Sequence, residues 1–473
     1  MGSSSDESNS EKNFQSEPKR CQSNFITSDQ AWSEIERDVF SGAKTQPITV
    51  NRLFCLPEPI LSNEESASKD TQSWNNSFME VSEAHVSAWD AFNDENVDIM
   101  FGDFLDERLQ HIPNPNLMAI HFNSHRESAN GNRVVFSIED EGDLNRMMEK
   151  AAIIDLLDDA FALAAKEFQE RVNAPAPGKL GTSFEAKRII IHRDSYMHKS
   201  SETIPDWLFC PTPESASGQH TSALRRALMY ARKQNLVPGP GEYEQWEPDP
   251  NGGPTLADVL SKYAGKGIDV AVVGEAKQKD VFDPANLANI DMFPQVRSTL
   301  GQMLMYCRWS KTRYAFVATS EEVTFLRFFR LDDTEDEKEQ FGVNYAVLPW
   351  KREPGNLSVW KGIWALVMLG LHNKYRSIVP EDQIRDLNSW SRLTNKDKDQ
   401  GQWENHLSKR VVDDGYWAQR SRGVEASTAE SATQLDRQEA GKSPGLLSKR
   451  PGSDTTAVER SPKVVKSEKN SKG

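Results

Sequence analysis

The stretch that decides the fold is residues 268–277, which read Ile-Asp-Val-Ala-Val-Val-Gly-Glu-Ala-Lys. Its first seven residues are typical of a central β-strand that is buried on both faces. Glu275 and Lys277 close this strand, and their spacing places both side chains on one face. Charges there are costly to desolvate and add little stability. A carboxylate can hold a hard cation, however, and an ammonium can orient water and steady a pentavalent phosphate, so the pattern favours divalent-metal phosphodiester chemistry.

The same three letters occur a second time, as Glu185-Ala186-Lys187. This copy precedes an apolar strand at residues 188–191 instead of closing it, and no Pro-Asp pair lies upstream of it. We interpret it as the solvated beginning of a strand. The copy at Glu275 therefore needs support from its surroundings.

Two further segments supply that support. Residues 204–209 place Asp206, which follows Pro205, at the start of another short apolar strand. Residues 293–309 predict a helix whose apolar positions are Phe293, Val296, Leu300, Leu304 and Met305. Gln302 and Tyr306 lie four residues apart on this helix and therefore share a face.

Taken in order, Pro-Asp, Glu-x-Lys and Gln-x-x-x-Tyr lie in a strand, a strand and a helix. This order resembles the PD-(D/E)XK nuclease superfamily, in particular its RecB-like Gln-x-x-x-Tyr branch, over residues 160–350. The chain also resembles uncharacterised fungal proteins with this core, in which a Pro-Gly stretch precedes a Val-Val-Gly-Glu-x-Lys strand. The resemblance implies an α/β fold with a restriction-endonuclease-like mixed central sheet flanked by helices. The sequence adds a long insertion and disordered termini to this fold.

The same resemblance implies a Mg²⁺- or Mn²⁺-dependent phosphodiesterase that acts on DNA. Asp206 and Glu275 would coordinate the metal together with the carbonyl of Ala276, and Lys277 would position the attacking water. Gln302 and Tyr306 would act through hydrogen bonds, by holding the catalytic residues or by touching the nucleic-acid backbone. Many members of this superfamily bind without cutting, so the alternative is an inactive scaffold that binds nucleic acid or protein.

The partner of Glu275 follows from strand geometry. Asp269 has the same side-chain parity, but six residues of straight strand separate the two carboxylates by about 20 Å, which is too far to share a metal. A neighbouring strand can bring Asp206 alongside Glu275. The superfamily usually joins these strands by a short connection, whereas 69 positions separate the two acids here, so an insertion at residues 211–262 must be looped out.

The insertion begins with a loop rich in Pro, Ser and Gly, and residues 221–236 then predict an amphipathic helix. Leu224, Leu228 and Met229 form its apolar side. Its charges are all basic: Arg225, Arg226, Arg232 and Lys233. Two interpretations stay open for this helix, a solvated face and an element that contacts phosphates beside the site.

The whole chain is acidic, with a net charge of −15 over 473 residues, so binding of nucleic acid must be local. Its four cysteines are scattered and suit a reducing compartment. The sequence contains no 18-residue apolar run and no signal-peptide core at the N-terminus, which predicts a soluble intracellular protein without a membrane partner. Lys449-Arg450 and the lysines of residues 463–466 resemble a bipartite nuclear-import signal, with a cytoplasmic location as the alternative.

The composition divides the chain into four regions. Residues 1–28 are expected to be disordered, and residues 29–138 form an acidic, partly helical region with short helices that dock on the core or stay mobile. Residues 139–380 contain the core, and residues 381–473 form a polar, mostly disordered tail. The tails and the Trp-bearing N-terminal segments are candidate contacts for protein partners.

Four elements are expected within the core. Residues 139–173 predict a long helix, and because the superfamily core opens with a helix that sometimes lends an acid to the site, Glu167 and Glu170 are candidates. After the Gln-x-x-x-Tyr helix, residues 313–319 and 323–331 predict a hairpin. A strand at 344–350 and a buried helix at 357–372 follow.

Overall fold

The computed structural model describes residues 49–54, 61–63, 79–107, 136–138, 141–150, 153–174, 187, 189–193, 205–211, 269–331, 340–351, 356–393 and 401–418, with scattered positions between 226 and 262. All of these residues belong to the first of two units into which the chain divides, Met1–Val424. The expected disordered N-terminus and the nuclear-import signal lie outside the described residues.

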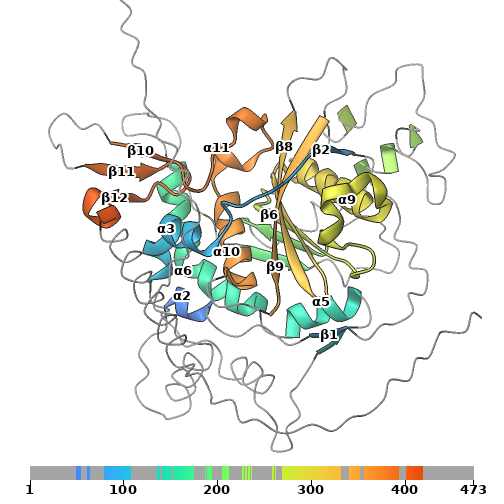
Figure 1. Cartoon of the computed structure of the whole chain (residues 1–473), viewed down its shortest axis with the longest axis horizontal. Coiled ribbons are helices and arrows are strands. Elements are labelled where there is room, and N and C mark those ends of the chain that lie inside the picture. Colours follow the sequence, from blue (N-terminus) through green and yellow to red (C-terminus); the bar gives the residue numbers. More distant parts are fainter. Residues whose placement is uncertain are drawn as a thin grey trace, which may run out of the picture. The chain divides into compact units, whose positions relative to one another are not determined.

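A seven-stranded mixed sheet forms the centre of the described part (Figure 1). The strands follow one another across it in the order β2-β9-β8-β7-β6-β5-β4. Their bounds are Val81–Ala88 for β2, Ile190–Arg193 for β4, Trp207–Cys210 for β5, Val272–Ala276 for β6, Tyr314–Ala318 for β7, Glu322–Leu331 for β8 and Gln340–Pro349 for β9. The β2–β9 and β6–β7 pairs are parallel, and the other pairs are antiparallel. The expected mixed α/β sheet is therefore confirmed.

The middle of the sheet is built from runs that are apolar on both faces. Every residue of β5, β6 and β7 is buried, as expected for strands covered by helices on both sides. The predicted hairpin is confirmed, because β7 and β8 pair antiparallel around a turn whose Thr319 hydroxyl accepts from the amide of Glu322 at 3.2 Å.

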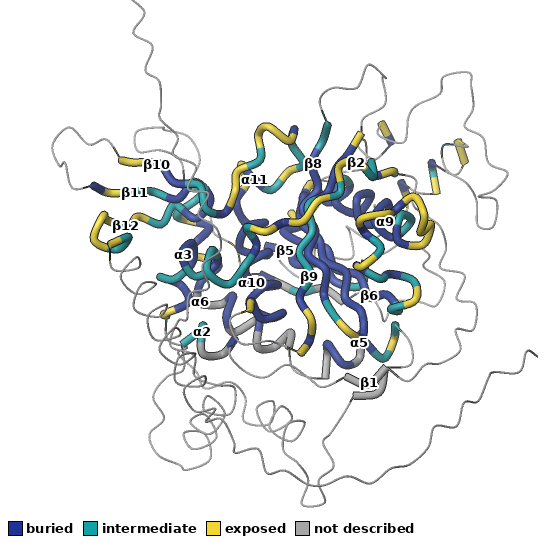
Figure 2. The backbone as a smooth tube through the Cα atoms, in the orientation of Figure 1, coloured by how far each residue is buried: buried dark blue, intermediate teal, exposed yellow. Residues whose placement is uncertain are grey.

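Two hydrophobic layers cover the two faces of the sheet (Figure 2). Ala315 and Val317 of β7 pack with α9 (Pro294–Ser310) and with the 3-10 segment η2 (Pro284–Met292). Their neighbours Tyr314 and Phe316 pack on the opposite side with α10 (Val359–Gly370) and α6 (Ile153–Asn173). The predicted helix at 357–372 is confirmed, and every residue of α10 is buried.

The remaining described elements lie around this core. The helical ones are α2 (Val50–Leu53), α3 (Asp94–Leu105), α5 (Glu141–Lys150), α11 (Asn373–Arg376) and the 3-10 turn η3 (Glu381–Gln383). β1 (Leu61–Asn63) and β3 (Phe136–Ile138) form a parallel pair. β10 (Trp390–Arg392), β11 (Gln402–Asn405) and β12 (Val411–Asp413) form an antiparallel sheet of their own.

The boundaries differ from the sequence predictions in three places. The single helix expected at 139–173 consists of two helices, α5 and α6. The N-terminal region contributes helix α3 but also β2, a strand at the edge of the central sheet. Residues 390–413, which the sequence assigned to a polar tail, form the three-stranded sheet. Trp390 and Val412 bury apolar surface there against Ile99 of α3, which offsets the polar composition of these short strands.

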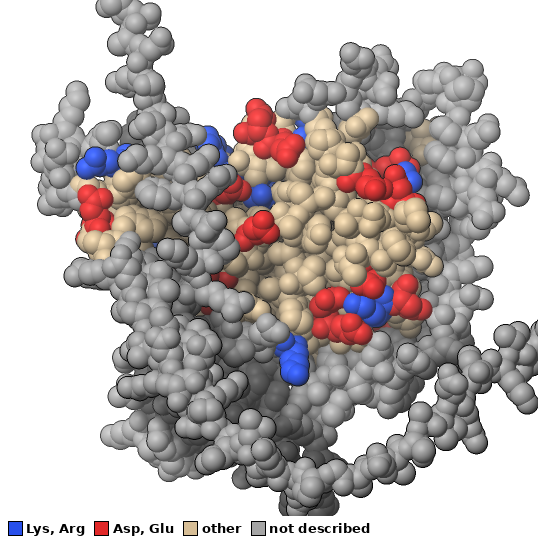
Figure 3. Space-filling model, in the orientation of Figure 1, with Lys and Arg blue, Asp and Glu red and all other residues tan. Residues whose placement is uncertain are grey.

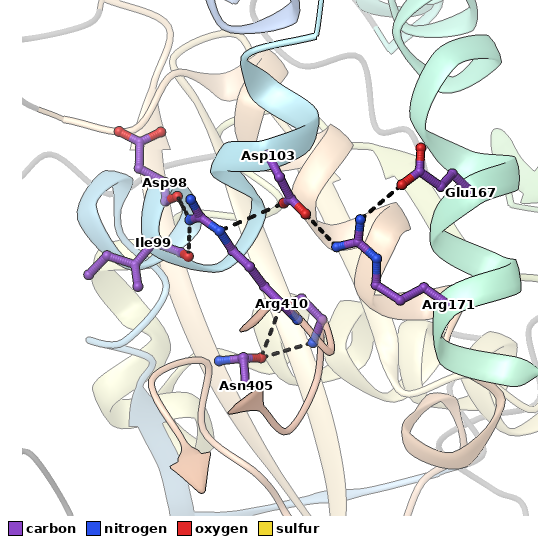
Figure 4. Close-up of polar contacts among 8 residues, drawn as sticks. Asp98, Ile99, Asp103, Glu167, Arg171, Asn405 and Arg410 are labelled. Carbon is purple, nitrogen blue, oxygen red and sulfur yellow. Dashed lines mark hydrogen bonds and ion pairs between the residues drawn. The ribbon is translucent and has the colours of Figure 1, made fainter. Parts of the chain in front are cut away.

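Helix α3 is held by a cluster of ion pairs that we call the α3 clamp (Figure 4). Arg410, which follows β11, donates to the carbonyl oxygens of Asp98 and Ile99. Asp103 of α3 lies between Arg410 and Arg171 of α6 and pairs with both. Lys361 of α10 is only 2 % exposed, and its Nζ lies 2.7 Å from Asp94. Three separate parts of the chain therefore converge on one helix.

None of the helices in the described part of the chain combines the length and the apolar character that a membrane span requires.

Candidate functional site

Asp206 and Glu275 lie opposite each other, where β5 begins and the neighbouring strand β6 ends. The antiparallel register pairs Trp207 with Gly274 and Leu208 with Val273, so its continuation by one residue sets Asp206 against Glu275. Leu208 and Val273 both belong to the layer under α9, and the alternation of side chains puts the two acids on that same face. The sequence separation of 69 between the two acids does not prevent this pairing, because the strands themselves set the register.

Gly274 allows the ring of Phe316 to pack directly against the backbone of β6 beside this pair. A Cβ atom at Gly274 would lie 2.3 Å from the ring of Phe316, which packs over the strand on the α10 side. Phe316 stacks in turn on Trp207, with 5.6 Å between the ring centroids. The large aromatic residues on one face of β5–β7 therefore fix the backbone that carries the acids on the other.

Hydrogen bonds join the acids and the lysine into one cluster, which we call the β5–β6 site. The carboxylate of Asp206 accepts from the amide of Ala276 at 2.8 Å. Glu275 accepts from the amide of Asp206 at 3.3 Å and from the Nζ of Lys277 at 2.8 Å. Glu275 and Lys277 are 5 % and 7 % exposed, whereas Asp206 is half-buried. The three predicted catalytic residues thus meet at one place.

Helix α9 adds the two predicted supporting residues. The Nε2 of Gln302 donates to the hydroxyl of Tyr306 at 2.8 Å and to Glu275 at 3.3 Å. Tyr306 is buried, and its pKa is raised well above the usual value by burial and by the nearby charge of Glu275. Tyr306 therefore stays a neutral phenol that fixes Gln302, which in turn fixes one carboxylate oxygen.

Two further residues of the site come from α5, and sequence reasoning missed both. The Oε1 of Glu141 lies 3.7 Å from the Nζ of Lys277, and the side chain of Asn145 hydrogen bonds to Asp206. The expected candidates lie elsewhere: Glu167 pairs with Arg171 at 3.0 Å, and Glu170 is exposed. The signal in the sequence was the four-residue spacing of Glu141 and Asn145, which places both on one helix face.

Burial dominates the electrostatics of the two acids. It raises the pKa of Glu275 to about 8, although Lys277 opposes the shift, and the charge of Asp206 adds to it. It raises the pKa of Asp206 to about 6 against the opposing effects of Lys277 and of the Ala276 amide. Burial alone would lower the pKa of Lys277, but Glu275, Glu141 and Asp206 together raise it above its usual range. One ammonium thus compensates three carboxyl groups incompletely.

The oxygen atoms of this cluster fit a hard divalent cation. No group of three or more His, Cys, Asp or Glu side chains in the described ranges is arranged to hold a metal. The donors that meet at this site are the carboxylates of Asp206 and Glu275 and neutral oxygens beside them. The Oδ1 of Asn145 is buried and has no hydrogen-bond partner among the described residues, although this side chain binds Asp206. Mg²⁺ commonly uses one or two carboxylates and keeps several waters, which matches this donor set.

The surroundings of the site carry more acidic than basic charge. Lys279 is close to three carboxylates, at 2.6 Å from Glu322, 3.0 Å from Glu321 and 3.3 Å from Asp283. On the face that Figure 3 shows, acidic side chains form several patches, and basic side chains lie within or beside them. Lys277 and Lys279, which follow the end of β6, are therefore already paired with carboxylates of the protein.

The basic helix of the insertion is described in part. Ala227 and Ala231 pack into the layer under α9, whereas Arg226 and Lys233 are exposed. The expected apolar side was wrong for Met229, which is 64 % exposed, because the small alanines make the contact. Leu224, Arg225, Leu228 and Arg232 lie outside the residues whose side chains the structure describes.

The two rejected candidates also have clear positions. Asp269 lies before β6 and pairs with Arg376 at 3.1 Å and with Lys187 at 3.8 Å, far from the strand end that carries Glu275. Lys187 is exposed, as expected for a solvated beginning of a strand.

No protein-family model, no curated protein and no solved structure matches this chain.

Proposed function

We propose that this chain is a metal-dependent phosphodiesterase that cleaves DNA at the β5–β6 site. One observation carries the proposal: two carboxylates from neighbouring strands and the ammonium of Lys277 meet in one buried cluster. A cluster of this kind costs stability, because burial leaves the acids poorly compensated. A bound cation would offset that cost, because it adds positive charge beside the two acids.

The order of elements around the cluster also supports the proposal. The cluster contains Pro-Asp, Glu-x-Lys and Gln-x-x-x-Tyr in a strand, a strand and a helix, on one face of a mixed sheet. This is the order that resembles the PD-(D/E)XK superfamily and its restriction-endonuclease-like fold. The preceding helices, α5 and α6, agree with a core that opens with a helix, and α5 lends an acid, Glu141, to the cluster.

Each residue of the cluster has a role in this proposal. Asp206 and Glu275 hold the cation with the carbonyl of Ala276, and Asn145 adds a neutral oxygen beside them. Mg²⁺ or Mn²⁺ supplies Lewis-acid polarisation of the phosphate and lowers the pKa of a bound water. Lys277 stays protonated, so it orients the attacking water and offsets the negative charge that develops on the phosphate.

Gln302 and Tyr306 act by position. The neutral Tyr306 hydroxyl fixes the amide of Gln302, and that amide restricts the rotation of the Glu275 carboxylate. A carboxylate that is held in advance loses less freedom when the cation binds, which increases affinity without a further contact.

One observation favours the alternative, an inactive scaffold of the same fold that binds nucleic acid or protein. Lys279 is fully engaged by Asp283, Glu321 and Glu322, so the surface near the site offers a polyanion little attraction. A basic segment of a protein partner would suit such a surface better than DNA. The exposed Arg226 and Lys233 are the described cations that favour DNA instead.

The test is cleavage of plasmid and of labelled linear DNA by the purified full chain in Mg²⁺, Mn²⁺ or a chelator. The unmodified protein should cut only with a divalent metal. Lys277→Ala and Glu275→Gln should each lower the rate about 10²–10⁴-fold, because each removes a group that acts on the reacting phosphate. Lys166→Ala is the matched control, since Lys166 is an exposed lysine on α6.

Circular dichroism and thermal unfolding must show that the variants fold. Equal cutting by the unmodified protein and by Lys277→Ala would assign the activity to a contaminant or to another site. Folded protein that cuts no DNA under any of these conditions would leave the scaffold function.

A further inference from the structure

Arg313 is a buried arginine whose charge no described acid compensates. It is 1 % exposed and lies directly before β7, where its amide donates to the carbonyl of Arg376 at 2.7 Å and its carbonyl accepts from Phe328 at 2.9 Å. Its Nε and Nη2 atoms are buried without a hydrogen-bond partner in the described part of the chain. Native proteins rarely leave such donors unpaired, and a buried charge is costlier still.

The identity of the two atoms is informative. Nε and Nη2 carry the parallel N–H bonds on one edge of the guanidinium, which is the edge that binds the two oxygens of a carboxylate or phosphate side by side. A guanidinium stays protonated in proteins. The whole bidentate edge of Arg313 is therefore charged and unpaired within the described part of the chain.

His372 supplies another unpartnered donor near Arg313. Its Nδ1 accepts the amide of Lys374 at 3.3 Å at the beginning of α11, so in the neutral ring the proton resides on Nε2. That Nε2 is buried and has no partner among the described residues. The charge of Arg313 contributes to lowering the pKa of His372, after the larger effects of burial, Lys409 and Lys374, so the two side chains are close enough to interact.

Arg376 completes the group. Its Nη2 binds Asp269 at 3.1 Å, but its buried Nε has no partner in the described ranges. Since the carbonyl of Arg376 binds the amide of Arg313, the two arginines are tied together through the backbone. Two neighbouring segments, the start of β7 and the residues around α11, thus bring unpaired donors together without an acceptor.

Other arginines of the molecule show that this is not general. Arg327 donates to Asn344 at 2.9 Å and 3.1 Å, although it is also buried. Arg410 and Arg171 are engaged by the carbonyls and carboxylates of the α3 clamp. These three arginines have oxygen acceptors within the protein, whereas the unpaired donors of Arg313, His372 and Arg376 have none among the described residues.

We propose that Arg313, His372 and Arg376 form a binding site for a small oxyanion, a phosphate or carboxylate group, at the start of β7. Phosphate fits better than carboxylate, because donors beyond the Arg313 edge can bind oxygens that a carboxylate lacks. Four residues of strand, about 13 Å, separate Arg313 from Val317, the residue that pairs with Glu275. The site is therefore distinct from the β5–β6 site and does not depend on the proposed cleavage of DNA.

The test is a titration of the full chain with sodium phosphate or sodium acetate, each up to about 10 mM, with chloride holding the ionic strength constant. At higher concentrations phosphate stabilises most proteins by exclusion from their surface, so the range must stay low. Phosphate should raise the unfolding temperature by about 2 °C and reach a plateau, with a smaller effect of acetate. Equilibrium dialysis with labelled phosphate should show one ion per chain.

Variants localise the site. Arg313→Lys keeps the charge but removes the parallel N–H pair, so it should lose the plateau response. His372→Phe keeps a ring against Tyr375 and removes one donor, so the affinity should fall about tenfold. Arg410→Met is the matched control, because it breaks the α3 clamp and should keep the response.

Two results would overturn the proposal. If the unmodified protein responds to neither phosphate nor acetate, by unfolding temperature and by dialysis, no such site exists. The same response in folded Arg313→Lys means that the ion binds elsewhere. If acetate has a larger effect than phosphate, the group recognised is a carboxylate, and the site itself stands.

Discussion

Among the described residues, two lysines are buried, Lys277 and Lys361, and the carboxylates around them lie in different environments. In the α3 clamp, Lys361 binds Asp94 and Asp98, which lie partly buried in the first two turns of α3. In the β5–β6 site, Lys277 faces Glu141, Glu275 and Asp206, and burial raises the pKa of the latter two.

The two arrangements have opposite effects on folding. The clamp satisfies its charges with partners from α6, α10 and the segment after β11, so it joins parts of the chain that are distant in sequence. The β5–β6 site concentrates negative charge that a single ammonium does not balance. Both kinds of ion pair are buried, so burial does not distinguish them. The β5–β6 site differs from the clamp by its excess negative charge.

The largest expected change in stability comes from breaking the clamp. Lys361→Met should lower the free energy of unfolding by about 3 kcal/mol, because it leaves Asp94 and Asp98 against an apolar helix without a counter-charge. Urea unfolding would measure it, with Lys166→Met as the exposed control, which should change by less than about 0.5 kcal/mol. A loss below about 1 kcal/mol for Lys361→Met would contradict the claim that the ion pairs of Lys361 stabilise the fold.

The next effect concerns the excess charge at the β5–β6 site. Mn²⁺ should stabilise the unmodified protein by about 2.7 kcal/mol when its concentration reaches about 100 times the Kd, because only the folded state offers the ligands. Glu275→Gln should abolish most of this gain, whereas Asp94→Asn should keep it. Thermal unfolding with and without Mn²⁺ checks the expectation, and an equal gain in Glu275→Gln would place the metal elsewhere.

How far the sequence predicts these two regions depends on the range of the contacts. Asp206, Glu275 and Lys277 were predictable because strand alternation and an apolar run are local signals, and the register then follows. Gln302 and Tyr306 follow from helical spacing in the same way. The site residues that were missed, Glu141 and Asn145, lie on α5, which the sequence predicted only as part of one long helix at residues 139–173.

Elements held by long-range contacts escaped prediction. β2 is an edge strand with mixed apolar and polar residues, so its own sequence does not indicate a strand clearly. Its pairing with β9 stabilises the extended conformation. The three-stranded sheet and the α3 clamp depend on contacts between residues some 300 positions apart, such as Arg410 with Asp98. Neither periodicity nor composition reports such a contact.

A smaller effect should appear as a dependence of stability on pH. The folded pKa of Glu275 is about 8 and its ordinary value is 4.5, so between these values the unfolded chain releases this proton more readily. Stability should therefore fall as the pH rises from 4.5 to 8. Glu275→Gln removes this contribution and should be the more stable of the two proteins at pH 8.

The measurement is urea unfolding of both proteins across this pH range without added metal. The difference between them should grow steadily with pH and should shrink when Mn²⁺ is added to the unmodified protein. A difference that is constant with pH would mean that Glu275 carries no strained charge, and the contrast between the two lysines would disappear.

The smallest effect is expected at the outer part of the clamp. Arg171 is partly exposed and pairs with Asp103 and Glu167, so Arg171→Met should cost roughly 0.5–1 kcal/mol. The loss should decrease at high salt, because exposed ion pairs are screened. The response to Mn²⁺ should stay unchanged, and a change in it would show that the clamp and the β5–β6 site are coupled.

The antiparallel pairing of β5 and β6 has a consequence for how this chain can diversify. The amide of Ala271 donates to the carbonyl of Phe209 at 2.8 Å, so the polypeptide leaves the sheet after β5 and comes back at an adjacent position. The connection between these two points includes Ala227 and Ala231, which pack into the core and constrain that part of it. For a flexible loop, doubling the length costs only about 0.6 kcal/mol of closure entropy, so the rest of the connection can change in length while the acids beside it keep their spacing.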